Sequence, residues 1–132
     1  MNVWVDGWQM QCCGTPFAVG DDVEWTLSSG CDIAWLKRVV GPEIANSISA
    51  SEEHHGGLPD GAPTPNGVVT GIRAAWSEFA ALPGGDPRTL HPVAGTQELV
   101  QVDRADGWER ERQGLEFNGY VVELDLHDSP GR

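Results

Sequence analysis

Positive charge is scarce in this sequence of 132 residues. Eight lysine and arginine residues stand against twenty aspartates and glutamates, so the formal net charge is −12 at pH 7, and Lys37 is the single lysine. A field of this sign repels phosphate backbones and anionic lipid surfaces. The shortage of cations therefore argues against nucleic acid and membranes as partners, and it leaves an unknown protein or a small molecule.

Long apolar runs are missing as well. No stretch approaches the roughly 20 apolar residues that a helix needs to cross a bilayer. The start of the chain does not read as a secretion signal, because Asp6 and Gln9 interrupt its apolar residues. We expect a cytoplasmic protein with one globular domain over residues 1–127 and a flexible tail at 128–132.

Cysteine is rare too. The three cysteines, Cys12, Cys13 and Cys31, are odd in number and too few for a disulfide scaffold. Adjacent cysteines rarely bridge each other, because the required geometry is strained. The sequence therefore predicts reduced thiols, which fits a reducing compartment.

Alternating strand patterns are what the chain has in quantity. Apolar and polar residues alternate over 2–9, 23–27, 97–103 and 120–126, and the last of these places Tyr120, Val122 and Leu124 on one face. Such strands have one buried and one solvated face, as in an antiparallel sheet. We predict a mainly β (or α+β) fold: a small antiparallel β-barrel, or a strongly bent sheet, with one or two short helices.

Several segments are less clear. Residues 31–40 suit a short helix capped by Asp32 better than a buried strand, and 44–53 alternates only loosely. Residues 68–82 carry strand-forming residues up to Ile72 and a helical stripe beyond it, so a strand followed by a helical turn is expected. Glycine and proline predict surface loops at about 56–67 and 83–95.

One cluster of residues suggests a metal site. Zinc prefers thiolate and imidazole ligands, which the pairs Cys12/Cys13 and His54/His55 would supply, with Glu53 beside the histidines. The spacing argues against it, because paired zinc ligands normally stand two to four residues apart and neighbours on a strand point to opposite faces. Small half-buried cysteines and solvated histidines are the simpler interpretation.

A cysteine nucleophile at Cys12 or Cys13 is a second chemical possibility. It requires a base within hydrogen-bonding reach and surroundings that lower the thiol pKa. None of the four histidines is singled out, and the many carboxylates would raise that pKa. We therefore assign no catalytic residue and consider an enzyme less well supported than a non-enzymatic protein.

Six tryptophans are many for this length, and most fall on strand-like positions that suit a core. Two of them, Trp8 and Trp108, instead end a repeated Asp-Gly-Trp triplet that begins at Asp6 and at Asp106. If these turns are exposed, the two indoles and the two aspartates form a candidate surface for a protein partner.

Motifs spread along the chain resemble a known group. The Trp-x-Asp-Gly-Trp-Gln-x-x-Cys-Cys-Gly opening, Phe-x-Val-Gly-Asp-x-Val-x-Trp, Glu-x-His-His-Gly, and the closing Arg-x-Asp-Gly-Trp and Gly-Tyr-Val-Val-Glu-Leu are similar to a small family of uncharacterised actinobacterial, streptomycete-type proteins. The resemblance covers nearly the whole chain, and it implies no activity and no catalytic residues.

The sequence thus favours a non-enzymatic binding or interaction module with an unknown partner. A protein that binds zinc or another transition metal through Cys12/Cys13 and His54/His55 is the first alternative. A small cysteine-dependent enzyme is the second.

Overall fold

The computed structural model describes residues 1–52 and 65–127, and most of their strands belong to one sheet. The strands of this sheet are β1 (Asn2–Asp6), β3 (Asp22–Glu24), β4 (Leu27–Ser28), β5 (Ile48–Glu52), β6 (Asn66–Ser77), β9 (Glu98–Gln101) and β11 (Glu116–Leu126). Their order is β3-β6-β11-β1-β5-β4, and β9 also pairs with β6. Every pairing is antiparallel except that of β1 with β5.

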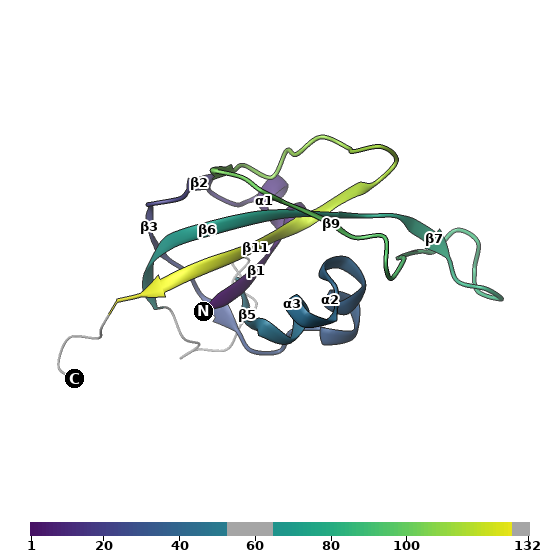
Figure 1. The fold of residues 1–132 in the computed structure, drawn as a ribbon, viewed down its shortest axis with the longest axis horizontal. Coiled ribbons are helices and arrows are strands. Elements are labelled where there is room, and N and C mark those ends of the chain that lie inside the picture. Colours follow the sequence, from purple (N-terminus) through teal and green to yellow (C-terminus); the bar gives the residue numbers. More distant parts are fainter. Residues whose placement is uncertain (53–64, 128–132) are drawn as a thin grey trace.

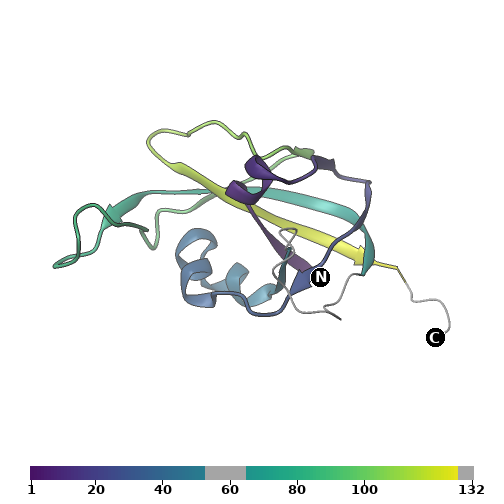
Figure 2. The same cartoon turned by 180° about the vertical axis from the view of Figure 1, so that it is seen from behind.

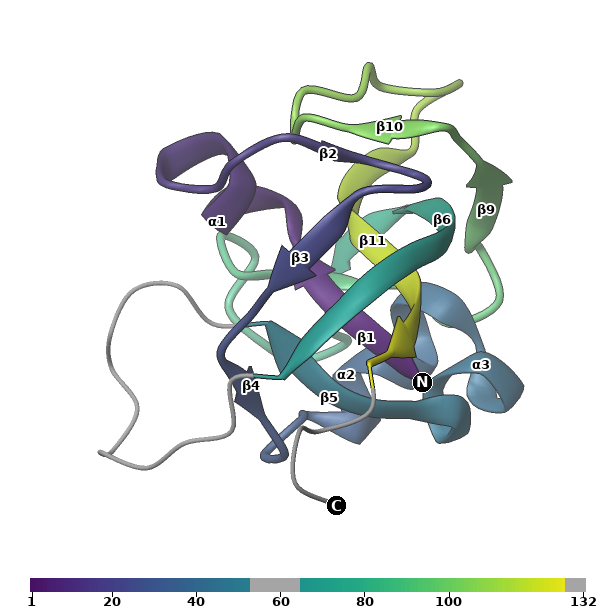
Figure 3. The same cartoon turned by 90° about the vertical axis from the view of Figure 1, so that its left-hand side faces the viewer.

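The sheet curls strongly, because its two edges are joined by a very short piece of chain. β3 lies at one end of the strand order and β4 at the other, yet only Trp25 and Thr26 separate them in sequence. Figure 3 shows β3 and β4 following one another across the opening of the curl, with β1 behind them. The predicted strongly bent β sheet is confirmed, as a half-barrel that does not close.

Apolar side chains pack on both faces of the sheet. Inside the curl, the main core includes Val3, Val5, Ile72 and Tyr120. On the outer face, a second cluster joins Trp4 and other strand residues to the helices α2 (Ile33–Val40) and α3 (Pro42–Ser47). α2 and α3 therefore lie on one side of the sheet, with α1 (Gly7–Cys12) and β2 (Phe17–Ala18) on the other (Figure 1 and Figure 2).

The predicted helix at 31–40 is confirmed, with its expected cap. The Asp32 carboxylate accepts a hydrogen bond from the Trp35 backbone N–H at 3.0 Å, and Gly41 ends the helix with φ +88°. Helix α3 then starts with Pro42 in its first turn, where proline has no N–H to leave unpaired. The loose alternation over 44–53 did not predict this helix. Only the second half of that segment, β5, is a strand.

Three other expectations are wrong in their boundaries. The strand predicted over 23–27 is two strands, β3 and β4, with Trp25 and Thr26 between them. The first strand ends at Asp6 and the chain enters α1, so the strand predicted over 2–9 is too long. The helical turn predicted after Ile72 is absent, because β6 continues to Ser77 between the strands β11 and β9, which satisfy its backbone on both sides. Tertiary pairing here overrides the helical stripe.

The described chain also has two small sheets of two strands each. β7 (Phe79–Ala81) pairs with β8 (Leu90–Pro92), which lies inside the loop predicted at 83–95, and β2 pairs with β10 (Arg104–Ala105). The predicted 128–132 tail and most of the predicted loop 56–67 lie outside the described residues. In the part of the chain that is described, no helix is long and apolar enough to cross a membrane.

Candidate functional site

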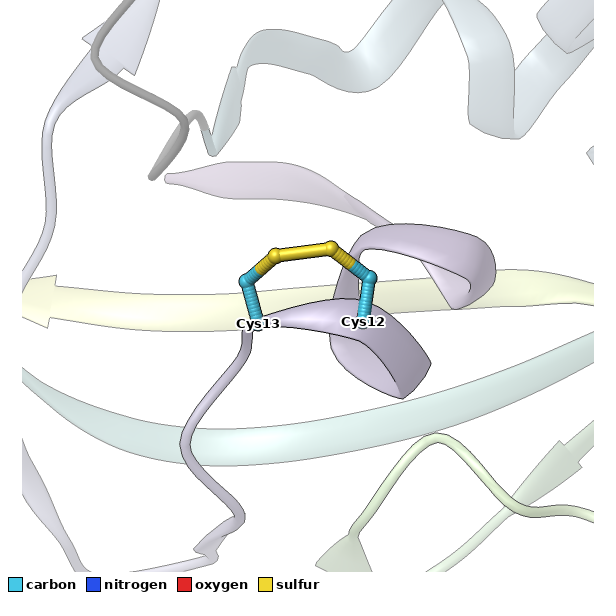
Figure 4. The surroundings of a disulfide bond; sticks show 2 residues. All are labelled: Cys12 and Cys13. Carbon is cyan, nitrogen blue, oxygen red and sulfur yellow. A yellow bond between two sulfur atoms is a disulfide. The ribbon is translucent and has the colours of Figure 1, made fainter.

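The cysteine pair differs from its prediction. Cys12 and Cys13 are joined in a disulfide, so the expectation of reduced thiols at these two positions is wrong. The pair falls at the end of α1 instead of on a strand, and both side chains rise from the same side of the backbone (Figure 4). A disulfide supplies neither a zinc ligand nor a nucleophile, because both require the thiolate. Cys31, the free cysteine, is separate from the pair and lines a cavity of about 110 Å³ together with Trp4 and Trp35.

The other half of the predicted metal site, Glu53 with His54 and His55, lies outside the described residues. Within residues 1–52 and 65–127, no group of three or more His, Cys, Asp or Glu side chains could hold a metal ion. A zinc site that combines both pairs therefore stays a prediction.

The described chain has a groove of about 450 Å³ beside the cysteine pair. Many of its lining residues belong to α1, β2, β3 and the segments that join them, and Figure 3 shows these elements beside one another. Its lining residues are Val5, Met10, Cys13, Thr15, Pro16, Phe17, Asp21, Asp22, Val23, Glu24, Trp25 and Glu52. A volume of this size falls in the range of small-molecule sites in proteins.

The floor of the groove is apolar. Val5, Met10 and Phe17 are at most 5% exposed, and they belong to the main core. Trp25 packs against Phe17 with its ring nearly perpendicular, at 73°, and with the ring centroids 4.9 Å apart. The two-residue link between the sheet edges therefore places an indole on the wall of the groove.

Four carboxylates complete the lining. Asp21 accepts a hydrogen bond from the Ala18 backbone N–H at 2.9 Å, Asp22 pairs with His127, and Glu24 is exposed on β3. Glu52 is only 7% exposed, which is unusual for a charged side chain. Among the described residues that line the groove there is no lysine, arginine or histidine, so its own side chains give it negative charge.

The turn of the second Asp-Gly-Trp triplet contacts helix α1, the helix that contains Gly7 and Trp8 of the first triplet. The Gln11 side-chain amide donates a hydrogen bond to the Gly107 carbonyl at 2.8 Å. A Cβ atom at Gly107 would lie 2.7 Å from the Met10 Cβ, and φ there is +87°, so only glycine allows this approach. The structure thus places the turn at Gly107 against Met10 and Gln11, and a partner-binding role of Asp6, Trp8, Asp106 and Trp108 stays a prediction.

A buried tyrosine holds the second of these turns in place. The Tyr120 hydroxyl accepts from the Gly107 backbone N–H at 3.0 Å and lies 3.4 Å from a Glu109 carboxylate oxygen, to which it can donate. Burial raises the pKa of Tyr120 far above its ordinary value, so the hydroxyl stays protonated. Burial, and then the neighbouring Asp106 carboxylate, raises the pKa of Glu109.

Sequence reasoning missed the groove and this tyrosine. Asp21 and Asp22 line the same groove as Val5 and Met10 only because the whole sheet curls, so no local pattern could reveal their place. Tyr120 did carry a signal, since it is the one tyrosine of the chain and faces inward on the clearest strand. Its hydroxyl needs a partner once buried.

The comparison with family models shows to which family the chain belongs. Residues 1–126 match the model of a family of unknown function, DUF6578. The chain belongs to this family. Neither the curated proteins nor the solved structures contain a significant match. Membership confirms the expected relation to uncharacterised proteins, and any function has to be argued from the site itself.

Proposed function

We propose that this member of the DUF6578 family is a non-enzymatic binding module that holds a small organic cation in its groove. One observation carries the proposal: an apolar, aromatic floor is combined with four carboxylates and with no basic side chain among the described lining residues. The apolar floor favours a hydrocarbon or aromatic body. The carboxylates favour a positive charge on the ligand, and the face of an indole ring such as that of the half-buried Trp25 also attracts cations.

The two alternatives from the sequence are less well supported. Zinc binding through Cys12 and Cys13 requires their reduction to thiolates, together with the approach of His54 and His55. A cysteine nucleophile at the same pair requires the same reduction. An actinobacterial source and a cytoplasmic location remain expectations from the sequence, and neither supports the proposal.

Calorimetric titration with three ligands of matched shape tests the role of charge. Phenethylamine is cationic at pH 7, 2-phenylethanol is neutral and phenylacetate is anionic, while all three carry the same ring. We expect a Kd of about 1 mM for the amine, typical of a ligand with nine heavy atoms, and no measurable binding of the anion. Equal affinity for the amine and the alcohol would contradict the proposal.

A pair of variants tests the place of binding. Glu24→Gln removes one exposed carboxylate from the groove and should weaken amine binding about two- to fivefold, the usual effect of one exposed charge pair. Glu43→Gln makes the same charge change in the first turn of α3, outside the groove lining, and should leave the affinity unchanged. An equal loss in both variants would show that only the overall charge matters.

A further inference from the structure

The disulfide between Cys12 and Cys13 lies in the open at the edge of the groove. Both cysteines are exposed to solvent, and Cys13 belongs to the groove lining. Figure 4 shows the bond spanning the two side chains at the end of α1. A dithiol in solution can therefore reach the bond, and exposed disulfides are the labile ones, whereas structural disulfides resist reduction.

This disulfide contributes little to the stability of the fold. It joins two residues that are adjacent in sequence, whereas a disulfide stabilises a protein more when it closes a longer loop of chain. Hydrogen bonds hold the backbone at the pair, because the N–H groups of Cys13 and Gly14 both donate to the Gln9 carbonyl, at 2.9 and 3.0 Å. The bond can therefore open while the protein stays folded.

The pair is connected to the groove on both of its sides in the sequence. Met10 on the groove floor precedes it, and residues 15–17, which also line the groove, follow it. Gly14 packs on Met10 so closely that a Cβ atom there would lie 2.6 Å from the Met10 Sδ. Helix α1 has six residues, well below the roughly 12 that an isolated helix needs, so its position depends on such contacts. A change at Cys13 is therefore passed to the floor and the wall of the groove.

We infer that the Cys12/Cys13 pair is a redox site that sets the shape of the groove. An external dithiol attacks the bond through a mixed disulfide, gives up two electrons and two protons, and becomes a disulfide itself, while the S–S bond of the pair breaks into two thiols. An external disulfide reverses the reaction. The disulfide form holds the groove as described, and the dithiol form has a looser floor. The consequence for cation affinity rests on the proposed function, whereas the change of shape does not.

The coupling is reciprocal. If reduction of the pair weakens cation binding by some factor, a bound cation must make the pair harder to reduce by the same factor. We expect about fivefold or more, the lower end of common coupling between two sites. The affinity and the redox equilibrium are measured independently, so the two factors can be compared.

The first experiment follows the redox equilibrium of the full chain. The protein is equilibrated without denaturant in varied ratios of reduced to oxidised dithiothreitol, quenched in acid, unfolded and alkylated, and its mass counts the thiols. We expect a reversible passage between one alkyl group, on Cys31, and three, with an unchanged circular dichroism spectrum. Phenethylamine should raise the ratio needed for reduction. Three thiols at every ratio, or a bond that opens only in urea, would overturn the inference.

The second experiment measures phenethylamine binding by calorimetry in both redox states. The Kd should rise about fivefold or more on reduction. The double variant Cys12→Ser/Cys13→Ser should fold and bind with the weaker affinity in either buffer. Cys31→Ser is the matched control, because it removes the one other thiol and should keep the full response. Binding that is equal in the two redox states would contradict the coupling.

NMR separates this inference from the proposed function. ¹⁵N–¹H spectra of the oxidised and reduced chain are compared without ligand, and we expect shifts at Met10, Phe17 and the Trp25 indole. If phenethylamine binds neither form, the proposed function fails, and these shifts alone uphold the redox site. Shifts confined to residues 11–14 would overturn the redox inference, whether or not the amine binds.

Discussion

At the residue scale, Tyr120 connects the core to the turn that carries Trp108. Its ring packs edge-to-face against Phe117 and Phe17 inside the curl, while its hydroxyl reaches the Gly107 backbone and Glu109. The tyrosine therefore couples the stability of the core to the position of the surface turn.

Replacing Tyr120 by phenylalanine keeps the ring and removes the hydroxyl. The buried Gly107 N–H then loses its acceptor, and an unsatisfied buried donor costs about 1–3 kcal/mol. We expect the free energy of unfolding in urea to fall by this amount, with the m-value unchanged. Phe117→Leu, which alters the neighbouring ring without touching the hydrogen bond, serves as the packing control. A Tyr120→Phe variant as stable as the parent would show that the hydrogen bond contributes nothing net.

Glu109 gives the chain a specific pH dependence. Burial, followed by the Asp106 carboxylate, raises the pKa of Glu109 above its ordinary value of 4.5, so the folded state holds this proton more tightly than the unfolded chain does. Its contribution to stability is therefore fully present below pH 4.5 and is lost as the pH rises through the raised pKa.

Glu109→Gln should remove that dependence while keeping an oxygen for the Tyr120 hydroxyl. We expect the variant to gain stability relative to the parent as the pH is raised from 4 to 7, measured by urea unfolding at each pH. Glu111→Gln removes an equal charge at an exposed neighbouring position and controls for the net charge. A stability difference that is constant with pH, or that moves in the opposite direction, would contradict the assigned shift.

At the element scale, α2 is the helix that the sequence described best. Its cap, its apolar face and its glycine terminator are all local signals, and all three are present in the structure. Local signals of this kind can be read from one segment, because the hydrogen bonds that satisfy them lie within that segment.

Asp32→Ala should destabilise the protein by about 1 kcal/mol, because the Trp35 N–H loses its capping oxygen. Thermal unfolding followed by circular dichroism measures the change. The control is Glu43→Ala, which removes an exposed carboxylate in the first turn of α3 without a cap hydrogen bond. Equal losses in the two variants would show that charge at the helix start, and not capping, is responsible.

Elements set by distant pairing were harder to predict. β6 was expected to change into a helix after Ile72, yet it pairs with β11 and β9 from later parts of the chain. Likewise, Cys12 and Cys13 were expected on or near a strand, yet they lie at the end of α1. This helix begins at Gly7, where a side chain would collide with Phe117. The sequence did predict the bent β sheet and the helix at 31–40.

At the scale of the whole molecule, the groove is a consequence of the curl. Its floor comes from β1, α1 and β2. Its carboxylates come from β5, from β3 and from the residue before β3, and its indole comes from the link between the two sheet edges. No single segment contains the groove, which is why the pattern of one segment could not reveal it.

The central claim is that the groove of this DUF6578 protein binds an organic cation. The most direct measurement is a ¹⁵N–¹H NMR titration of the full chain with phenethylamine, with resonances assigned. The account predicts saturable shifts at Val5, Phe17, Val23 and the Trp25 indole, and none at Trp8 or Trp108. Shifts that are absent from the groove, or that are equally large with 2-phenylethanol, would contradict it.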